Sequence, residues 1–147
     1  MNHLSYPARD KSAIAVGATT SHGCAGSYSS FGDGIDIAAP GGGNDANLTS
    51  SVWDAHHCYG NGRAIYQQTF VSNPRDFHIV GFVGTSEATP HVTAAAALVI
   101  ASGVVGSHPS PGTVLHRLEK TARDIGAPGY DKRYGYGLLN AAAAVGG

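Results

Sequence analysis

Short apolar runs bounded by turn residues dominate the hydrophobic pattern of the N-terminal half of the chain. Residues 12–19 (SAIAVGAT) and 35–39 (IDIAA) have the continuous apolar character of buried parallel strands. The second run stops at the forced turn Pro-Gly-Gly-Gly of residues 40–43. Residues 64–70 and 77–83 are two apolar-rich runs separated by a polar turn segment, which predicts a β-hairpin.

A helical pattern follows Gly84. Residues 88–102 are dense in Ala, Leu, Val and Ile, which predicts a helix that is apolar on most sides and therefore buried. Pro90 falls in its first turns, where a missing N–H costs least. Ser110 and Pro111 are suited to cap and begin a second helix, and residues 138–145 predict a short terminal one. Together these elements predict an α/β fold, but two parallel strands are too few to cover so apolar a helix.

Residues 41–63 are rich in Gly, Asn, Asp, Ser and His, and we expect a long surface loop inserted in the domain. Cys24 and Cys58 are the only cysteines. A disulfide and two free buried thiols are both compatible with the sequence. A zinc site with His56 and His57 has the right atoms, but the ligand spacing is irregular.

Composition narrows the function classes. The net charge is -1 and charged residues make up 13% of the chain, which gives no basic surface for nucleic acid and no cationic face for a membrane. The hydrophobic fraction of 42% is sufficient for a packed core. No apolar run approaches the about 20 residues needed to span a bilayer, and no signal peptide is visible at the start.

Ser86 is the candidate for chemistry. It follows the Gly84-Thr85 turn at the mouth of the apolar helix, where free backbone N–H groups and the helix dipole favour developing negative charge. A serine hydroxyl held there can attack an acyl carbon while its own amide helps to stabilise the oxyanion. The alternative is that Thr85 or Ser86 only caps the helix.

The segment GTSEATPHV at 84–92 resembles the nucleophile motif of the subtilisin-like serine proteases (the subtilase, or peptidase S8, family), whose form is G-T-S-x-A-x-P-H-V. Three further stretches resemble family motifs in the family's order: YPA…AIAVGA at 6–18, YSSFG…IDIAAPG at 28–41 and YGYGLLNA at 134–141. The resemblance therefore runs from about residue 5 to the end. It implies that residues 1–147 are the C-terminal part of a subtilisin-like three-layer parallel-sheet domain, with the segment 41–63 as a loop insertion.

By this resemblance Ser86 is the nucleophile of a serine-type endopeptidase, assisted by a histidine base and an orienting aspartate. The family's Asp and His motifs lie far upstream of the YPA strand, and its oxyanion-hole asparagine lies a short way upstream. Asn2 lacks the A-A-G-N context of that asparagine. We therefore expect the 147 residues alone to be inactive and to need the missing N-terminal part of the domain as a partner.

Local histidines are poor substitutes for the missing base. His91 is five residues after Ser86, so it is rotated by about 140° around the helix and faces away. His78, with Asp76 two residues earlier, is the only nearby pair that could act as a makeshift base, as in an independent esterase. An ordinary strand histidine is the competing interpretation.

The family resemblance also implies roles for three other positions. Glu87 stands where the family commonly has Met. Pointing into the cleft, its carboxylate would oppose oxyanion charge and alter leaving-group preference, whereas pointing to solvent it would do little. Ala8 matches a small position bordering the primary specificity pocket. Asp36 matches the acid of a cation site in some subtilases, with a plain strand-edge carboxylate as the alternative.

The resemblance implies a protein or peptide substrate, no cofactor for the chemistry, at most a structural calcium, and an extracellular location. The competing function is a decayed, non-catalytic subtilase remnant that acts as a binding module. In either case we expect the 147 residues to expose a large apolar patch, because the family covers the nucleophile helix with strands that this chain lacks.

Overall fold

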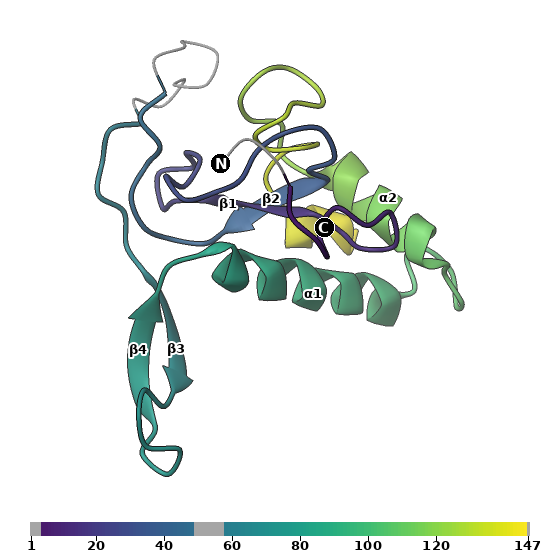
Figure 1. Cartoon of the computed structure of the whole chain (residues 1–147). Helices are drawn as coiled ribbons and strands as arrows, with labels where there is room; N and C mark the ends of the chain where they lie inside the picture. Colours follow the sequence, from purple (N-terminus) through teal and green to yellow (C-terminus); the bar gives the residue numbers. More distant parts are fainter. Residues whose placement is uncertain (1–3, 49–57, 147) are drawn as a thin grey trace.

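The computed structural model describes residues 4–48 and 58–146 (Figure 1). Its elements in chain order are the strands β1 (Val16–Thr19), β2 (Ile37–Pro40), β3 (Ile65–Thr69) and β4 (His78–Phe82), followed by the helices α1 (Thr85–Ser102), α2 (Pro111–Thr121) and α3 (Ala141–Ala144). The predicted strands, hairpin and helices are all present, with shifted ends.

The strands β1 and β2 form a parallel pair in which Val16 lies opposite Ile37 and Thr19 opposite Pro40. The C-terminal segment runs along the other edge of β2: the Ala38 amide donates to the Gly137 carbonyl (2.9 Å), and the Leu139 amide donates to the Ala38 carbonyl (2.8 Å). Both edges of β2 are therefore bonded, and its Ile37, Ala38 and Ala39 are buried.

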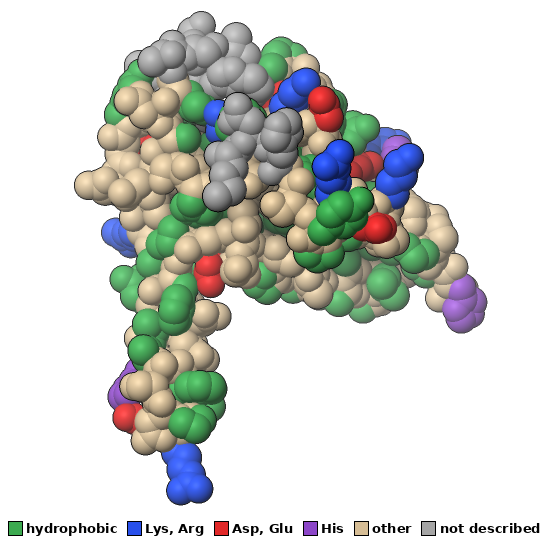
Figure 2. All heavy atoms as spheres, in the orientation of Figure 1, with side chains coloured by type: hydrophobic (Ala, Val, Ile, Leu, Met, Phe, Trp, Pro, Cys, Tyr) green, Lys and Arg blue, Asp and Glu red, His purple; other side chains and the backbone are tan. Residues whose placement is uncertain are grey.

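Helix α1 packs across this sheet through one stripe of side chains: Ala88, Val92, Ala95 and Val99. Helices α2 and α3 pack beside it and contribute Val114, Leu118 and Ala144 to the same core. The other side of α1 is open, with Leu98 53% and Ile100 51% exposed. The expectation of a helix buried all round is thus wrong for the described residues, because the two strands cover only one face. Figure 2 shows hydrophobic side chains along this underside and along the hairpin, as expected of an exposed apolar surface.

The helix ends follow their predicted caps only in part. The Ser110 hydroxyl accepts from the Thr113 amide (3.1 Å), and Pro111 begins α2 as predicted. Helix α3 is shorter than the predicted 138–145, because its preceding residues are bonded to β2. Helix α1 begins at Thr85, earlier than the predicted residue 88.

The strands β3 and β4 form the predicted hairpin, with Ile65 opposite Phe82 and Thr69 opposite His78. It projects away from the body of the molecule (Figure 1). Ile79 is 76% exposed and Tyr66 is 68% exposed, so neither face of the hairpin is covered among the described residues.

A disulfide joins Cys24 to Cys58, with their Cα atoms 5.7 Å apart. This decides among the alternatives for the two cysteines and removes both from any zinc site; His56 and His57 lie outside the described residues. Residues 41–48 and 58–63, the described parts of the predicted loop, contain no helix or strand. Residues 41–43, 45, 46 and 58 are buried, so these parts of the loop are not wholly at the surface. None of the described helices is both long and apolar enough to cross a membrane.

Candidate active site

Ser86 is the second residue of α1 and is exposed. The N-cap is Gly84, in an extended conformation, and no side chain caps the helix. The interpretation of Thr85 or Ser86 as a capping side chain is therefore wrong. Within the described residues the Ser86 hydroxyl has no hydrogen-bond partner, so it is available to a ligand.

The turn before Ser86 is fixed to the carboxyl end of the parallel sheet by the backbone. The Gly84 amide donates to the Gly41 carbonyl (3.0 Å), and the Gly41 amide donates to the Thr19 carbonyl at the end of β1 (2.8 Å). A methyl group on Gly41 would lie 2.5 Å from the Gly84 carbonyl oxygen, so only glycine permits this close approach. The serine thus stands at the edge of a parallel sheet where ligands commonly bind.

The first turn of α1 provides a backbone amide that can stabilise negative charge. The carbonyl oxygen of Gly84 accepts from the amides of Glu87 (3.1 Å) and Ala88 (3.3 Å). The Ser86 amide has no backbone acceptor among the described residues, as expected for the start of a helix. Together with the helix dipole, it can stabilise an oxyanion formed at the Ser86 hydroxyl.

The histidines nearest in sequence do not serve Ser86. The Nδ1–H of His91 donates to the Glu87 carbonyl on its own helix (2.8 Å), as its spacing predicts. His78 Nε2 does lie 3.1 Å from Asp76 Oδ2, but β4 runs from His78 toward α1, so this pair is at the far end of the hairpin (Figure 1).

Sequence reasoning missed a third histidine. His22 Nδ1 lies 2.9 Å from Oδ2 of the buried Asp45, which also accepts from the Thr20 hydroxyl (2.6 Å) and the Gly60 amide (2.8 Å). No spacing signal could have found this pair, because it depends on how the loops fold. Among the described residues the pair has no contact with Ser86, and it anchors the loop beside the disulfide.

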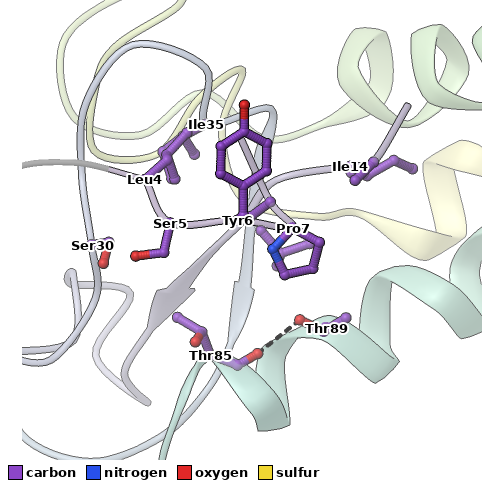
Figure 3. A pocket seen from close by; sticks show the side chains of 12 residues that line it. Leu4, Ser5, Tyr6, Pro7, Ile14, Ser30, Ile35, Thr85 and Thr89 are labelled. Carbon is purple, nitrogen blue, oxygen red and sulfur yellow. Dashed lines mark hydrogen bonds between the residues drawn. The ribbon is translucent and has the colours of Figure 1, made fainter. Parts of the chain in front are cut away.

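A cavity of about 310 Å³ opens beside the start of α1. Thr85 and Thr89 line one wall, and Tyr6 and Pro7 line another (Figure 3). Ala8 also lines the cavity. The Thr89 hydroxyl donates to the Thr85 carbonyl (2.9 Å), which leaves the methyl groups of this wall for packing. The predicted pocket residue Ala8 thus lines a cavity together with Thr85, the residue before Ser86.

The side chain of Glu87 is half-buried and folds back over the start of its own helix. A methyl group on Gly84 would lie 2.8 Å from Glu87 Oε2. Burial, with a further contribution from the negative charge of Glu87, raises the pKa of Tyr28 to about 12. The Glu87 carboxylate therefore lies over the first turn of its own helix, close to the Gly84 backbone.

Among the described residues Asp36 forms no metal centre with other acids. Its Oδ2 accepts from the Ala15 amide (2.7 Å), and burial raises the pKa of the carboxyl group despite this hydrogen bond. In the part of the chain that the structure describes, no three His, Cys, Asp or Glu side chains come together to hold a metal ion.

Known proteases are similar to this chain in both sequence and fold. The chain is 34% identical over 144 residues to "Subtilisin" of Bacillus pumilus, covering 97% of this chain and 40% of the relative. It is 36% identical over 142 residues to an "Extracellular protease" of Xanthomonas campestris pv. campestris, covering 96% of this chain and 20% of the relative. The chain therefore spans well under half the length of these relatives.

Among solved structures, a lanthipeptide protease matches 95% of this chain and 42% of its own length, with a TM-score of 0.71 and 29% identity. A protease of Pseudoalteromonas arctica PAMC 21717 matches 95% and 37%, with a TM-score of 0.69 and 26% identity. These matches confirm the predicted α/β subtilisin-like fold. Because the model of the subtilase family also matches residues 2–137, the chain belongs to the subtilase family of peptidases.

Proposed function

We propose that this chain is the nucleophile-bearing part of a serine endopeptidase and that Ser86 attacks the peptide bond. The observation that carries the proposal is the exposed Ser86 hydroxyl at the second position of α1, with the capping position already taken by Gly84. A serine with no structural task, beside a free amide at a sheet edge, has the environment of an acyl-transfer nucleophile.

In the proposed reaction, Ser86 Oγ forms a bond to the substrate carbonyl carbon and transfers its proton to a histidine base. The C–N bond then breaks, and the same proton goes to the departing amine. Water, deprotonated by the histidine, attacks the acyl-serine ester and releases the acid product together with the free hydroxyl. The Ser86 amide stabilises the oxyanion in both halves.

The chemistry of the family requires no cofactor. We propose that Asp36 acts as a strand-edge carboxylate, because its Oδ2 accepts a hydrogen bond from the Ala15 amide.

The histidine and its aspartate are proposed to come from the N-terminal part of the family domain. The open side of α1 is the surface on which that part would pack. Pro90, Ala94 and Ala97 line a shallow hollow there together with Ser86. Packing on this side would both cover the apolar surface and bring the base to the hydroxyl. The 147 residues are therefore proposed to form one part of a single catalytic domain. Residues 41–63 are proposed to be an inserted loop of that domain.

An extracellular location is proposed as well. The Cys24–Cys58 disulfide is of the kind that persists in oxidising compartments. The Xanthomonas relative is named an extracellular protease.

A hybrid protein tests the function. The N-terminal part of the B. pumilus subtilisin, up to the matched segment, would be joined to these 147 residues and treated with a serine-directed peptidyl phosphonate. We expect stoichiometric labelling of Ser86 in the hybrid and none in the 147 residues alone. Ser86→Ala should abolish labelling, whereas Ser107→Ala, at an exposed serine beyond α1, should leave it intact.

Two results would contradict the proposal. A folded hybrid that is never labelled would favour the non-catalytic binding module. Labelling of the isolated chain would show that the base is contained in these residues.

A further inference from the structure

Three glycines form a slot for the side chain of Tyr28. A methyl group on Gly26 would lie 2.9 Å from the ring atom Cζ, one on Gly43 would lie 3.2 Å from Cε1, and one on Gly41 would lie 2.6 Å from the hydroxyl oxygen. Gly26 and Gly41 do not have positive φ angles. Glycine is therefore required at these two positions by the closeness of their neighbours and not by the backbone conformation.

The Tyr28 hydroxyl holds one peptide group of the glycine turn at residues 41–43. It donates to the Gly42 carbonyl (2.8 Å), and the amide of the same peptide group, that of Gly43, donates to the Arg63 carbonyl (3.0 Å). Gly42 has a φ of 75°, and the turn has no side chain of its own to hold this conformation. Burial raises the pKa of Tyr28 to about 12, so the hydroxyl keeps its proton and remains a donor at neutral pH.

The preceding peptide group of the same turn is bonded to the segment that carries the nucleophile. Its carbonyl, that of Gly41, accepts from the Gly84 amide (3.0 Å), and its amide, that of Gly42, donates to the Thr19 carbonyl (3.1 Å). Gly84 is the N-cap of α1, two residues before Ser86. The two peptide groups are joined through the torsion angles of Gly42, so a rotation of one displaces the other. The Tyr28 hydrogen bond is therefore linked to the position of Ser86.

We propose that Tyr28 is a positioning residue for Ser86. Its hydroxyl holds the Gly42 carbonyl and so fixes the glycine turn to which the start of α1 is bonded. The inference rests on the proposed function, in which Ser86 Oγ must be directed at a substrate carbonyl and at a histidine base at the same time. Attack needs the reacting atoms within a narrow range of distances and angles, so a looser turn lowers the rate of acyl transfer.

A role for the Tyr28 ring alone makes a different prediction. Tyr28→Phe keeps the ring in the glycine slot and removes only the hydroxyl. If the ring alone mattered, this variant would behave as the unaltered chain does. If the hydroxyl positions the serine, this variant is sufficient to loosen the turn.

Hydrogen exchange in the 147-residue chain measures the turn without catalysis. A hydrogen bond of this kind shifts an equilibrium by about three- to ten-fold, so Tyr28→Phe should speed exchange of the Gly84 amide by that factor. The matched control is Tyr130→Phe, which removes a hydroxyl that accepts from the Gly34 amide (2.9 Å) outside the turn. It should leave exchange at Gly84 unchanged. Unchanged exchange at Gly84 in Tyr28→Phe, or equal acceleration in both variants, would overturn the proposal.

The hybrid with the N-terminal part of the B. pumilus subtilisin gives the kinetic test. We expect Tyr28→Phe to lower the maximal rate constant for phosphonate labelling of Ser86 by about three- to ten-fold. The phosphonate concentration that gives half of this rate should not change, because binding of the probe is unaffected. Tyr130→Phe should alter neither quantity.

An unchanged maximal rate constant in Tyr28→Phe would overturn the positioning role, with or without a change in the half-saturating concentration. A hybrid that is never labelled contradicts the proposed function alone. The exchange of the Gly84 amide in the 147-residue chain then decides on Tyr28.

Discussion

The sheets β1–β2 and β3–β4 both contain two strands, but they differ in what covers them. The shorter sheet, β1–β2, is buried by α1 on one face and bonded along β2 by the C-terminal segment. The longer one, β3–β4, projects from the body with most of its residues exposed (Figures 1 and 2). Isolated two-stranded sheets are only marginally stable in water. The stability of these two sheets therefore depends less on strand length and pairing than on whether other elements pack over them. Ser86 is linked to both sheets: the Gly84 turn before it is hydrogen-bonded to the end of the covered sheet β1–β2, and this turn comes directly after strand β4 of the uncovered sheet.

Removal of the disulfide should have the largest effect, and only on the covered side. Cys24 and Cys58 close a loop with a sequence separation of 34. Cross-linking a loop of this length stabilises a fold by about 4 kcal/mol. We expect Cys24→Ser with Cys58→Ser to lower the free energy of unfolding by about that amount in urea denaturation. Hydrogen exchange in β3–β4 should be unchanged, because neither cysteine belongs to the hairpin. Faster exchange there would mean that the two sheets unfold together.

Two isoleucines give a matched test of coverage. Ile37 in β2 is 0% exposed, and Ile79 in β4 is 76% exposed. Ile37→Ala should destabilise the protein by about 3 kcal/mol through lost burial and a residual cavity. Ile79→Ala should change stability by less than about 0.5 kcal/mol. Comparable losses in thermal unfolding would show that the hairpin is covered in solution.

The sequence predicts the strands, the hairpin and the Ser110 cap because their signals are local. Turn residues bound the runs at 35–39 and 64–70, and a Ser-Pro pair begins α2. The start of α1 was missed because Thr85 to Glu87 are polar and carry no apolar period.

Other features depend on contacts between distant segments. The His22–Asp45 pair arises only when separate loops meet. The open face of α1 could not be located either. Leu98 and Val99 are adjacent and equally apolar, yet one is exposed and the other buried. Only the arrangement of the sheet decides which of them is covered.

Asp45 gives a smaller, pH-dependent test of the covered side. Burial favours a higher pKa for Asp45, but hydrogen bonds from Thr20, Gly60 and His22 and the charge of His22 outweigh it, so the pKa is lowered. A lowered pKa stabilises the fold above the unfolded-state value of about 3.9, and this stabilisation is lost as the pH falls through the folded-state value. Asp45→Asn should cost about 1–2 kcal/mol at pH 7.

The cost of Asp45→Asn should shrink as the pH falls from 5 to 3 in urea denaturation. Burial raises the pKa values of Asp36 and Asp131, which gives the opposite pH dependence. Both groups are present in the two proteins, so the difference between the curves isolates Asp45. A difference that stays constant with pH would mean that the loop is held without the carboxylate charge.

The smallest expected effect lies in the uncovered sheet. Phe70 and Phe77 meet edge to face across the hairpin end, with ring centroids 5.8 Å apart and an interplanar angle of 80°. Such a pair contributes about 0.5–1 kcal/mol in a double-mutant cycle. Phe70→Leu, Phe77→Leu and the double variant should speed hydrogen exchange in β3–β4 by a coupled amount and leave global unfolding unchanged. If the coupling appears in global unfolding instead, the hairpin unfolds in the same cooperative unit as β1–β2. The two sheets would then differ in exposure but not in stability.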